Sequence, residues 1–289
     1  MRIVVVVAMT SLPVLLLLTV TAFVTVVDAA PIKLRGVNYS IRQGADWEPF
    51  KCKQPYQVLT DLSLLNRVTE NTRVLSLTDC GGGSIILRAA KELGMKVWLG
   101  LWVDVDETVF EDERDELARM LEDGEIDGTT ILGVTVGSEA LYREDATIDQ
   151  MLFYLGQVRN LLDTYGLDNL PVSIVDIEPM YTAYPQLREA VDVTYINSFP
   201  FWEATPIDTA VDYLADKAGN LLRAPESQGK AFIVGETGWP SDGFIEGVGE
   251  ASSENQQQYF IDAYCYMEEQ GWEYYWFTGI DNAWRQVQE

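Results

Sequence analysis

Short apolar runs rich in Val, Ile and aromatic residues recur along the chain after its first 30 residues. Most of these runs are apolar nearly throughout, which is typical of strands that are buried on both faces. Eight of them are expected to be strands: Ile32–Tyr39, Thr72–Thr78, Lys96–Val103, Ile131–Glu139, Leu170–Glu178, Val193–Phe199, Ala231–Trp239 and Glu273–Asp281.

Segments of helical period separate the runs. Residues 57–68 place Val58, Leu62, Leu65 and Val68 on one stripe, and residues 148–165 form a second amphipathic stretch that ends at a glycine. Strands that alternate with helices predict parallel βαβ units, and eight of them fit a (β/α)8 TIM barrel better than an open doubly wound sheet. No Gly-x-Gly-x-x-Gly motif opens a helix, so a dinucleotide-binding fold has no support.

The two ends of the chain differ from the rest. Met1-Arg2 precedes an apolar run from Ile3 to Val27 and then small residues, which predicts a secretory signal over 1–29 and a catalytic barrel over 30–289. An uncleaved anchor is the rival interpretation, since a membrane span needs roughly 20 apolar residues. Only Asn282 to Glu289 follow the last expected strand, so the final barrel helix is expected to be short.

The chain is strongly acidic, with 20 Lys and Arg against 45 Asp and Glu and a net charge of −25. This balance argues against nucleic acid as a partner, because phosphate backbones bind basic surfaces. The charge is densest between Asp104 and Asp127, where no EF-hand spacing occurs. A solvated helix face is the expected explanation for that segment.

The cysteine and histidine content excludes several classes of catalytic mechanism. Three cysteines (Cys52, Cys80, Cys265) imply one disulfide and one thiol in an oxidising compartment, and the sequence leaves the pairing open. No histidine is present, which removes Ser-His and Cys-His nucleophiles and most zinc enzymes. We therefore expect carboxylate chemistry with no metal and no cofactor.

Active sites of such barrels form at the carboxyl ends of the strands. Two glutamates there follow apolar strands within distinctive local sequences: Glu139 in Gly133-Val134-Thr135-Val136-Gly137-Ser138-Glu139, and Glu236 in Val234-Gly235-Glu236-Thr237-Gly238-Trp239-Pro240-Ser241. The other polar residues at expected strand ends are Asn38, Asp79, Asp104, Glu178, Asn197 and Asp281. A lone glutamate there more often caps a helix or pairs with arginine, but two on strands four and seven face each other across the barrel mouth. Two such carboxyls are what glycoside hydrolysis requires.

The sequence around Glu236 resembles the nucleophile motif of glycoside hydrolase family 17, the β-1,3-glucanases, in its fungal-type branch. Further segments are similar to the family's other strand motifs: Gly36 to Tyr39, Arg73 through Cys80, Val97 to Trp102, Val136 to Arg143, Asn197 to Phe201, Tyr274 to Asp281, and Trp284-Arg285. The resemblance covers nearly the whole chain after the apolar start. It implies a retaining mechanism with Glu139 as acid/base and Glu236 as nucleophile.

Two departures from the family pattern are visible. The family normally has asparagine directly before the acid/base, where it binds the sugar 2-hydroxyl, and this chain has Ser138. Near the last strand the family usually has an acid and a lysine where this chain has Asn282 and Arg285. Because Ser138 replaces that asparagine, the acid/base half of the mechanism is where we expect any altered activity.

Aromatic and polar residues near the strand ends are expected to bind sugar, because sugar C–H faces stack on aromatic rings. The expected substrate-binding residues are Tyr39, Asp79, Trp102, Ser138, Asn197, Phe199, Trp239 and Trp276. Asn38-Tyr39-Ser40 is a formal glycosylation sequon, but we expect it to lie in a buried strand.

The sequence thus predicts a secreted, monomeric enzyme that acts on β-glucan outside the cell or in its wall, as an endo-β-1,3-glucanase or a glucanosyltransferase. A catalytically weakened glucan-binding wall protein is the alternative. Linkage preference, endo or exo action, and water or sugar as acceptor remain open at this point. A membrane contact is expected only if the apolar N-terminal segment is retained.

Overall fold

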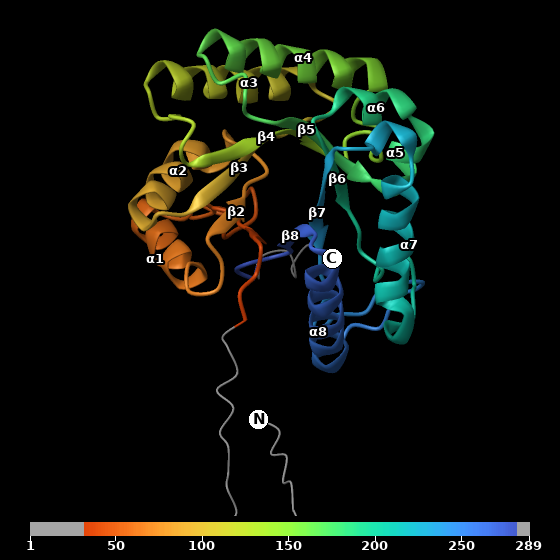
Figure 1. Cartoon of the computed structure of the whole chain (residues 1–289). Coiled ribbons are helices and arrows are strands. Elements are labelled where there is room, and N and C mark those ends of the chain that lie inside the picture. Colours follow the sequence, from red (N-terminus) through yellow and green to blue (C-terminus); the bar gives the residue numbers. More distant parts are fainter. Residues whose placement is uncertain (1–31, 282–289) are drawn as a thin grey trace, which may run out of the picture. The chain divides into compact units, whose positions relative to one another are not determined.

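The computed structural model describes residues 32–281, which form a closed barrel of eight parallel strands paired in chain order, with β8 returning to β1 (Figure 1). The strands are β1 (Val37–Asn38), β2 (Asn71–Arg73), β3 (Lys96–Leu101), β4 (Ile131–Ser138), β5 (Val172–Ile177), β6 (Val193–Asn197), β7 (Ala231–Thr237) and β8 (Glu273–Trp276). The predicted (β/α)8 TIM barrel is confirmed.

Helices connect successive strands around the outside of the barrel (Figure 1). They are α1 (Pro55–Leu65), α2 (Gly82–Leu93), α3 (Glu107–Glu122), α4 (Ile148–Thr164), α5 (Glu178–Ala183), α6 (Pro185–Ala190), α7 (Ala210–Leu222) and α8 (Ser253–Gln270), with short 3-10 turns at Asp79–Gly81, Ile207–Thr209 and Pro225–Ser227. Both α5 and α6 lie between β5 and β6, and α8 precedes β8. The short helix expected after the last strand falls on residues outside those described.

The expected strands are all present, but most end earlier than the apolar pattern predicts. The clearest case is the run Thr72–Thr78, where β2 stops at Arg73. The chain turns there because the buried carboxylate of Glu113, on α3, accepts hydrogen bonds from the Leu77 amide and from the Ser76 and Thr78 hydroxyls. Glu113 also corrects the expectation that the acidic segment is wholly a solvated face, since this side chain is fully buried.

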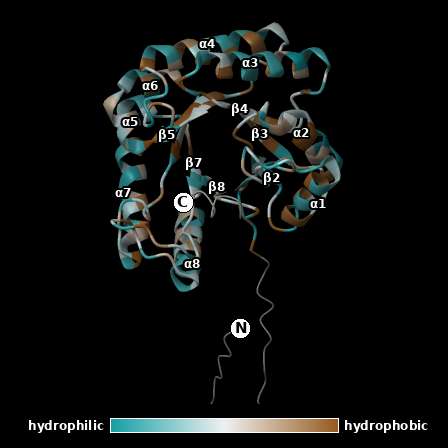
Figure 2. Ribbon diagram, turned by 180° about the vertical axis from the view of Figure 1, so that it is seen from behind, coloured by the Kyte–Doolittle hydropathy of each residue, from teal (hydrophilic) through white to brown (hydrophobic). Residues whose placement is uncertain are grey.

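The helix predictions hold to within a few residues. Helix α4 begins after Thr147, whose hydroxyl accepts from the amide of Gln150, and the chain leaves the helix at Gly166 with φ 70°. Helix α1 ends at Leu65, so Val68 lies beyond the helix and is exposed. Along the helices, hydrophilic and hydrophobic colours alternate in Figure 2, as expected for helices with one face on the barrel.

Aromatic rings fill the inside of the barrel. The Trp98 and Tyr195 rings meet edge to face at 5.2 Å between centroids, and both are buried. Glycines face them: a Cβ on Gly133 would lie 2.2 Å from the Trp98 ring, and one on Gly235 would lie 2.7 Å from the Tyr195 ring. The strands that carry Glu139 and Glu236 therefore need glycine where these rings pack.

One disulfide joins two loops at the carboxyl end of the barrel. Cys52, in the β1–α1 connection, bonds to Cys80, which follows β2, and Cys265 on α8 is free and exposed. The structure thereby selects one of the three pairings that the sequence leaves open. Within residues 32–281, no helix is both long and apolar enough to cross a membrane. The expected signal or anchor segment, Ile3 to Val27, lies outside the described residues.

Removing this disulfide is expected to destabilise the barrel. The bond closes a 28-residue separation, and the loop-closure model gives about 3–4 kcal/mol for a loop of this length. Cys52→Ser should therefore lower the melting temperature by roughly 10 °C in differential scanning calorimetry. Cys265→Ser removes a thiol without breaking a bond and serves as the control. Equal melting temperatures for the two variants would contradict the prediction.

Candidate active site

A buried arginine connects the strand ends at the barrel mouth. Arg73, the last residue of β2, is fully buried, and its Nη1 lies 2.7 Å from Glu236 Oε1 on β7 and 3.0 Å from Asn38 Oδ1 on β1. Its Nη2 donates to Ser138 Oγ on β4 at 3.2 Å. Four strands are thus tied together by one guanidinium, and a buried charge of this kind requires the carboxylate that it meets.

Glu236 is held on both sides by β7 and its neighbours. The residue is 7% exposed, its oxygen Oε1 accepts from Arg73 and from Ser138 Oγ, and its carbonyl accepts from the Ser198 amide. The register of β7 shifts against both β6 and β8 around this position. These contacts fix the orientation of the carboxylate, as a nucleophile requires.

Glu139 occupies a different environment at the end of β4. The residue is half-buried and has φ 61°, a left-handed conformation that is uncommon outside glycine. Its Oε1 accepts from Asn197 Nδ2 at 2.8 Å. Burial and the negative charge of Glu236 raise the pKa of Glu139, while the Asn197 hydrogen bond and the charges of Arg143 and Arg73 oppose that rise. A raised pKa suits a carboxylic acid that must deliver a proton.

Ser138 and Asn197 join the two glutamates into one network. Ser138 Oγ accepts from Arg73 and from Asn197 Nδ2 and donates to Glu236 Oε1, at 3.2–3.3 Å. The serine hydroxyl therefore uses all of its hydrogen-bonding capacity within the protein. Asn197 Oδ1 is buried beside Gly235 and has no hydrogen-bond partner among the residues the structure describes.

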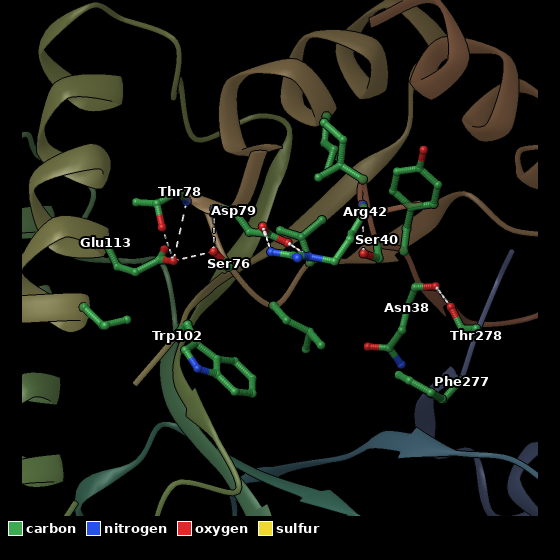
Figure 3. Close-up of a pocket in the computed structure, with 16 residues that line it drawn as sticks. Asn38, Ser40, Arg42, Ser76, Thr78, Asp79, Trp102, Glu113, Phe277 and Thr278 are labelled. Atoms are coloured by element: carbon green, nitrogen blue, oxygen red, sulfur yellow. Dashed lines mark hydrogen bonds and ion pairs between the residues drawn. The ribbon is translucent and has the colours of Figure 1, made fainter. Parts of the chain in front are cut away.

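A cavity of about 390 Å³ lies beyond the ends of β1, β2 and β3 (Figure 3). Asn38, which accepts from Arg73, lines it, whereas Glu139 and Glu236 do not. Three of the expected substrate-binding residues line it: Tyr39, Asp79 and Trp102. Asp79 is paired through both oxygens with Arg42, and the Trp102 ring has the Arg143 guanidinium 4.5 Å from its centroid. The Tyr39 hydroxyl donates to Asp61 and Lys53 lies over its ring, so little of this side chain is open.

The other expected aromatic residues lie in less open positions. Trp239 is 4% exposed, donates from its indole nitrogen to the Glu250 carbonyl and packs on Tyr259. Trp276 packs on Tyr259 and Phe260 of α8, which is the helix side of β8. These contacts give both rings packing partners, and neither tryptophan lines the cavity, so their contact with sugar stays a prediction. Phe199 remains half-buried, edge-on to Phe277.

Alternation along β8 determines which of its aromatic residues faces the cavity. Tyr275 points into the barrel beside Tyr195, so the side chain that follows points outward, and Phe277 comes next and lines the cavity. Phe277 is thus a cavity residue that the sequence does not single out, and the two-residue period of strands is the signal that could have found it.

Three further polar residues contribute to the site. In the sequence Asn38 is a candidate by its position at a strand end, whereas Arg73 is only part of a motif and Glu113 only one acid of the segment between Asp104 and Asp127. Asn38 is 2% exposed and donates to the Gly235 and Tyr275 carbonyls, which also confirms that the sequon is buried. Nothing in the local sequence of an arginine inside a strand predicts that it points into the barrel toward a carboxylate.

Glu178, another acid expected at a strand end, does not take part in the hydrogen-bond network of Arg73, Glu236 and Ser138 described above. It begins α5, is 7% exposed, and pairs with Lys217 Nζ at 3.1 Å. No group of three or more acids, cysteines or histidines suited to a metal ion occurs within residues 32–281.

The comparisons with known proteins point to one family. Residues 36–289 match the model of the BtgE/BtgC glycoside hydrolase domain. The chain is 29% identical to a glucan 1,3-beta-glucosidase of Arthroderma benhamiae, over 81% of this chain and 76% of that protein. It is 28% identical to a probable glucan endo-1,3-beta-glucosidase, btgC, of Aspergillus fumigatus over 90% of this chain, and spans 42% of that longer protein.

A solved structure agrees with the sequence relatives. The glycoside hydrolase family 17 β-1,3-glucanosyltransferase of Rhizomucor miehei superposes with a TM-score of 0.75 at 29% identity. The match covers 85% of this chain and 86% of that one. The sequence resemblance to family 17 is thereby confirmed.

Proposed function

Because the chain belongs to the BtgE/BtgC glycoside hydrolases, a fungal-type branch of family 17, we propose that it cleaves β-1,3-glucan with retention of configuration. Glu236 is the nucleophile and Glu139 the acid/base. The observation that carries this assignment is the contrast between the two carboxyls. Glu236 meets the Arg73 guanidinium at 2.7 Å, whereas burial and the charge of Glu236 raise the pKa of Glu139.

The reaction proceeds in two displacements. In the first, a Glu236 carboxylate oxygen attacks the anomeric carbon while the Glu139 proton passes to the departing glycosidic oxygen. In the second, Glu139, now ionised, takes a proton from water or from a sugar hydroxyl, whose oxygen displaces Glu236 from the anomeric carbon. The acceptor decides between hydrolysis and glucanosyl transfer. The cavity offers aromatic residues, among them Trp102 and Phe277, and several polar groups to a glucosyl unit of the bound chain.

Retention is tested by the configuration of the first product. With a laminarin-type oligosaccharide, proton NMR is expected to show the β anomer at the new reducing end before mutarotation, because two inversions at one carbon restore its configuration. Chromatography of the same mixture separates shortened products of hydrolysis from lengthened products of transfer. An α anomer appearing first would show inversion and contradict the assignment of Glu236 as nucleophile.

A second function is favoured by one observation. Ser138 stands where the family has asparagine, and its hydroxyl is already occupied by Arg73, Asn197 and Glu236. A chain that binds glucan but turns it over slowly would result if the sugar 2-hydroxyl lacked a strong partner. Binding of laminarin without product in the NMR assay supports this alternative.

Secretion is part of the proposal. The apolar run Ile3 to Val27 has the character of a signal or anchor, and the Cys52–Cys80 disulfide is typical of proteins in an oxidising compartment. A wall polysaccharide outside the cell would then be the substrate of a monomeric enzyme.

A further inference from the structure

The turn that carries Glu139 departs from ordinary backbone geometry. The β4–β5 register shifts between Val136 and Ser138, and both Gly137 (φ 70°) and Glu139 (φ 61°) are left-handed. For a residue with a side chain this conformation costs roughly 1–2 kcal/mol. Such a turn persists only where neighbouring groups hold it in place.

The neighbouring groups come mainly from β5. The Glu139 amide donates to the Val175 carbonyl at 2.8 Å, and the Leu141 amide donates to Asp176 Oδ2 at 2.9 Å. The other oxygen of Asp176, Oδ1, accepts from the Ile177 amide at 2.9 Å. One carboxylate therefore binds the amide that lies two residues after Glu139 and the amide that follows Asp176 itself. On the other side of the turn, Arg143 Nη1 donates to the Ser138 carbonyl.

Burying the carboxylate of Asp176 at this position costs desolvation free energy. It is fully buried, and no cation forms an ion pair with it among residues 32–281. Burial and, to a smaller extent, the charge of Glu139 raise the pKa of Asp176 to about 7, although three backbone hydrogen bonds oppose the rise. Charge-assisted bonds to backbone amides are shorter and stronger than neutral ones, so the carboxylate gives the turn a rigidity that an amide side chain would not.

The geometry points to Asp176 as the positioning residue of the acid/base, which holds the 139–142 turn so that Glu139 lies against Asn197 and beside Glu236. It contacts no reacting atom and acts through the backbone of the turn. The inference rests on the proposed function, because it assigns Asp176 to the proton-delivering half of that mechanism.

The test compares leaving groups. A laminarin-type oligosaccharide has a sugar alcohol as leaving group and needs the proton of Glu139, whereas a 2,4-dinitrophenyl β-glucoside or β-laminaribioside leaves without one. Asp176→Asn is expected to lower kcat/KM on the oligosaccharide by about 10²-fold, because small misplacement of a catalytic group has an effect of that order. On the dinitrophenyl substrate, kcat/KM should stay within about threefold of wild type, since general acid catalysis contributes nothing there.

Asp192→Asn is the matched control. Asp192 Oδ2 accepts from the Val172 amide at 2.8 Å at the opposite end of β5, so this variant also removes a carboxylate bound to the same strand. It should leave both substrates at wild-type rates. If Asp176→Asn does not fold, an ester in place of the Ala140–Leu141 peptide bond removes the Leu141 N–H and keeps every side chain. The same selective loss is expected.

The outcomes separate the two proposals. Equal losses on both substrates, in protein that folds like wild type, would show that Asp176 acts only on general structure and would overturn the inference alone. Wild-type protein that turns over neither substrate would overturn the proposed function and the inference with it.

Discussion

Glu236→Gln is expected to lower kcat/KM on laminarin-type oligosaccharides by at least about 10⁴-fold, the scale on which removal of a covalent nucleophile acts. Glutamine has the same shape, and its amide oxygen can still accept from Arg73 and Ser138, so the network around the site keeps its acceptor. What is lost is the anionic oxygen that bonds to the anomeric carbon. Initial rates from reducing-sugar release measure the effect, and circular dichroism verifies the fold.

Glu178→Gln is the matched control for this variant. Glu178 is also 7% exposed and also lies at the carboxyl end of a barrel strand, but its carboxylate pairs with Lys217 and accepts from the Thr182 hydroxyl. Its activity should stay within about twofold of wild type while stability falls, because removing one partner of a buried ion pair is costly. Mass spectrometry adds an independent measurement: a 2-deoxy-2-fluoro glucosyl fluoride should label wild type on the peptide containing Glu236. A label on another carboxylate would refute the assignment.

The barrel itself could be predicted because its strands are buried on both faces. Long apolar runs locate all eight strands, but they do not show where a strand ends, since loops near the mouth are also apolar. At β2 the end is set by Glu113, a residue some 40 positions away in sequence whose carboxylate binds the Ser76, Leu77 and Thr78 groups. A contact of that kind follows from the fold and cannot be inferred from local sequence.

The two candidate glutamates could be located for a related reason. A carboxylate that ends an apolar strand is conspicuous, and Glu139 and Glu236 both do so. The residues that support them are not conspicuous: Arg73 is one more residue within a predicted strand, and Asp176 lies one position before the end of β5. Their importance comes from what the barrel brings beside them, namely Glu236 for Arg73 and the 139–142 turn for Asp176.

Disulfide pairing and aromatic orientation show the same limit. The three cysteines allow three disulfide pairings, and the sequence favours none of them. The pairing follows from the fold, which places the β1–α1 loop beside the segment after β2. For Trp276 and Phe277, the direction of each side chain became evident only with Tyr275 located inside the barrel. The position of a residue along a strand predicted that it lies at the barrel mouth. Whether its side chain points into the barrel or toward the helices became evident only from the closed sheet.

Glu139→Gln is expected to lower kcat/KM on the same oligosaccharides by about 10²–10⁴-fold, the usual contribution of general acid catalysis. Glu139 must be protonated to act, so wild-type activity should fall as pH rises through its pKa. Because burial and the charge of Glu236 raise that pKa above the ordinary value of 4.5, the fall should occur at higher pH than for an exposed glutamate. The variant has no proton to lose at this position and should lack that alkaline limb.

Azide separates loss of acid/base chemistry from loss of structure. With a dinitrophenyl substrate the glycosyl-enzyme still forms in Glu139→Gln, but water is no longer activated, so the second step becomes slow. Azide needs no base, and it should restore turnover and yield the β-glycosyl azide, because it attacks the anomeric carbon from the face opposite Glu236 and displaces that carboxylate. Glu144→Gln, an exposed neighbour on the same loop, should keep wild-type rates and show no response to azide. If azide fails to accelerate Glu139→Gln, the defect does not lie in the activation of water, and Glu139 is not the acid/base.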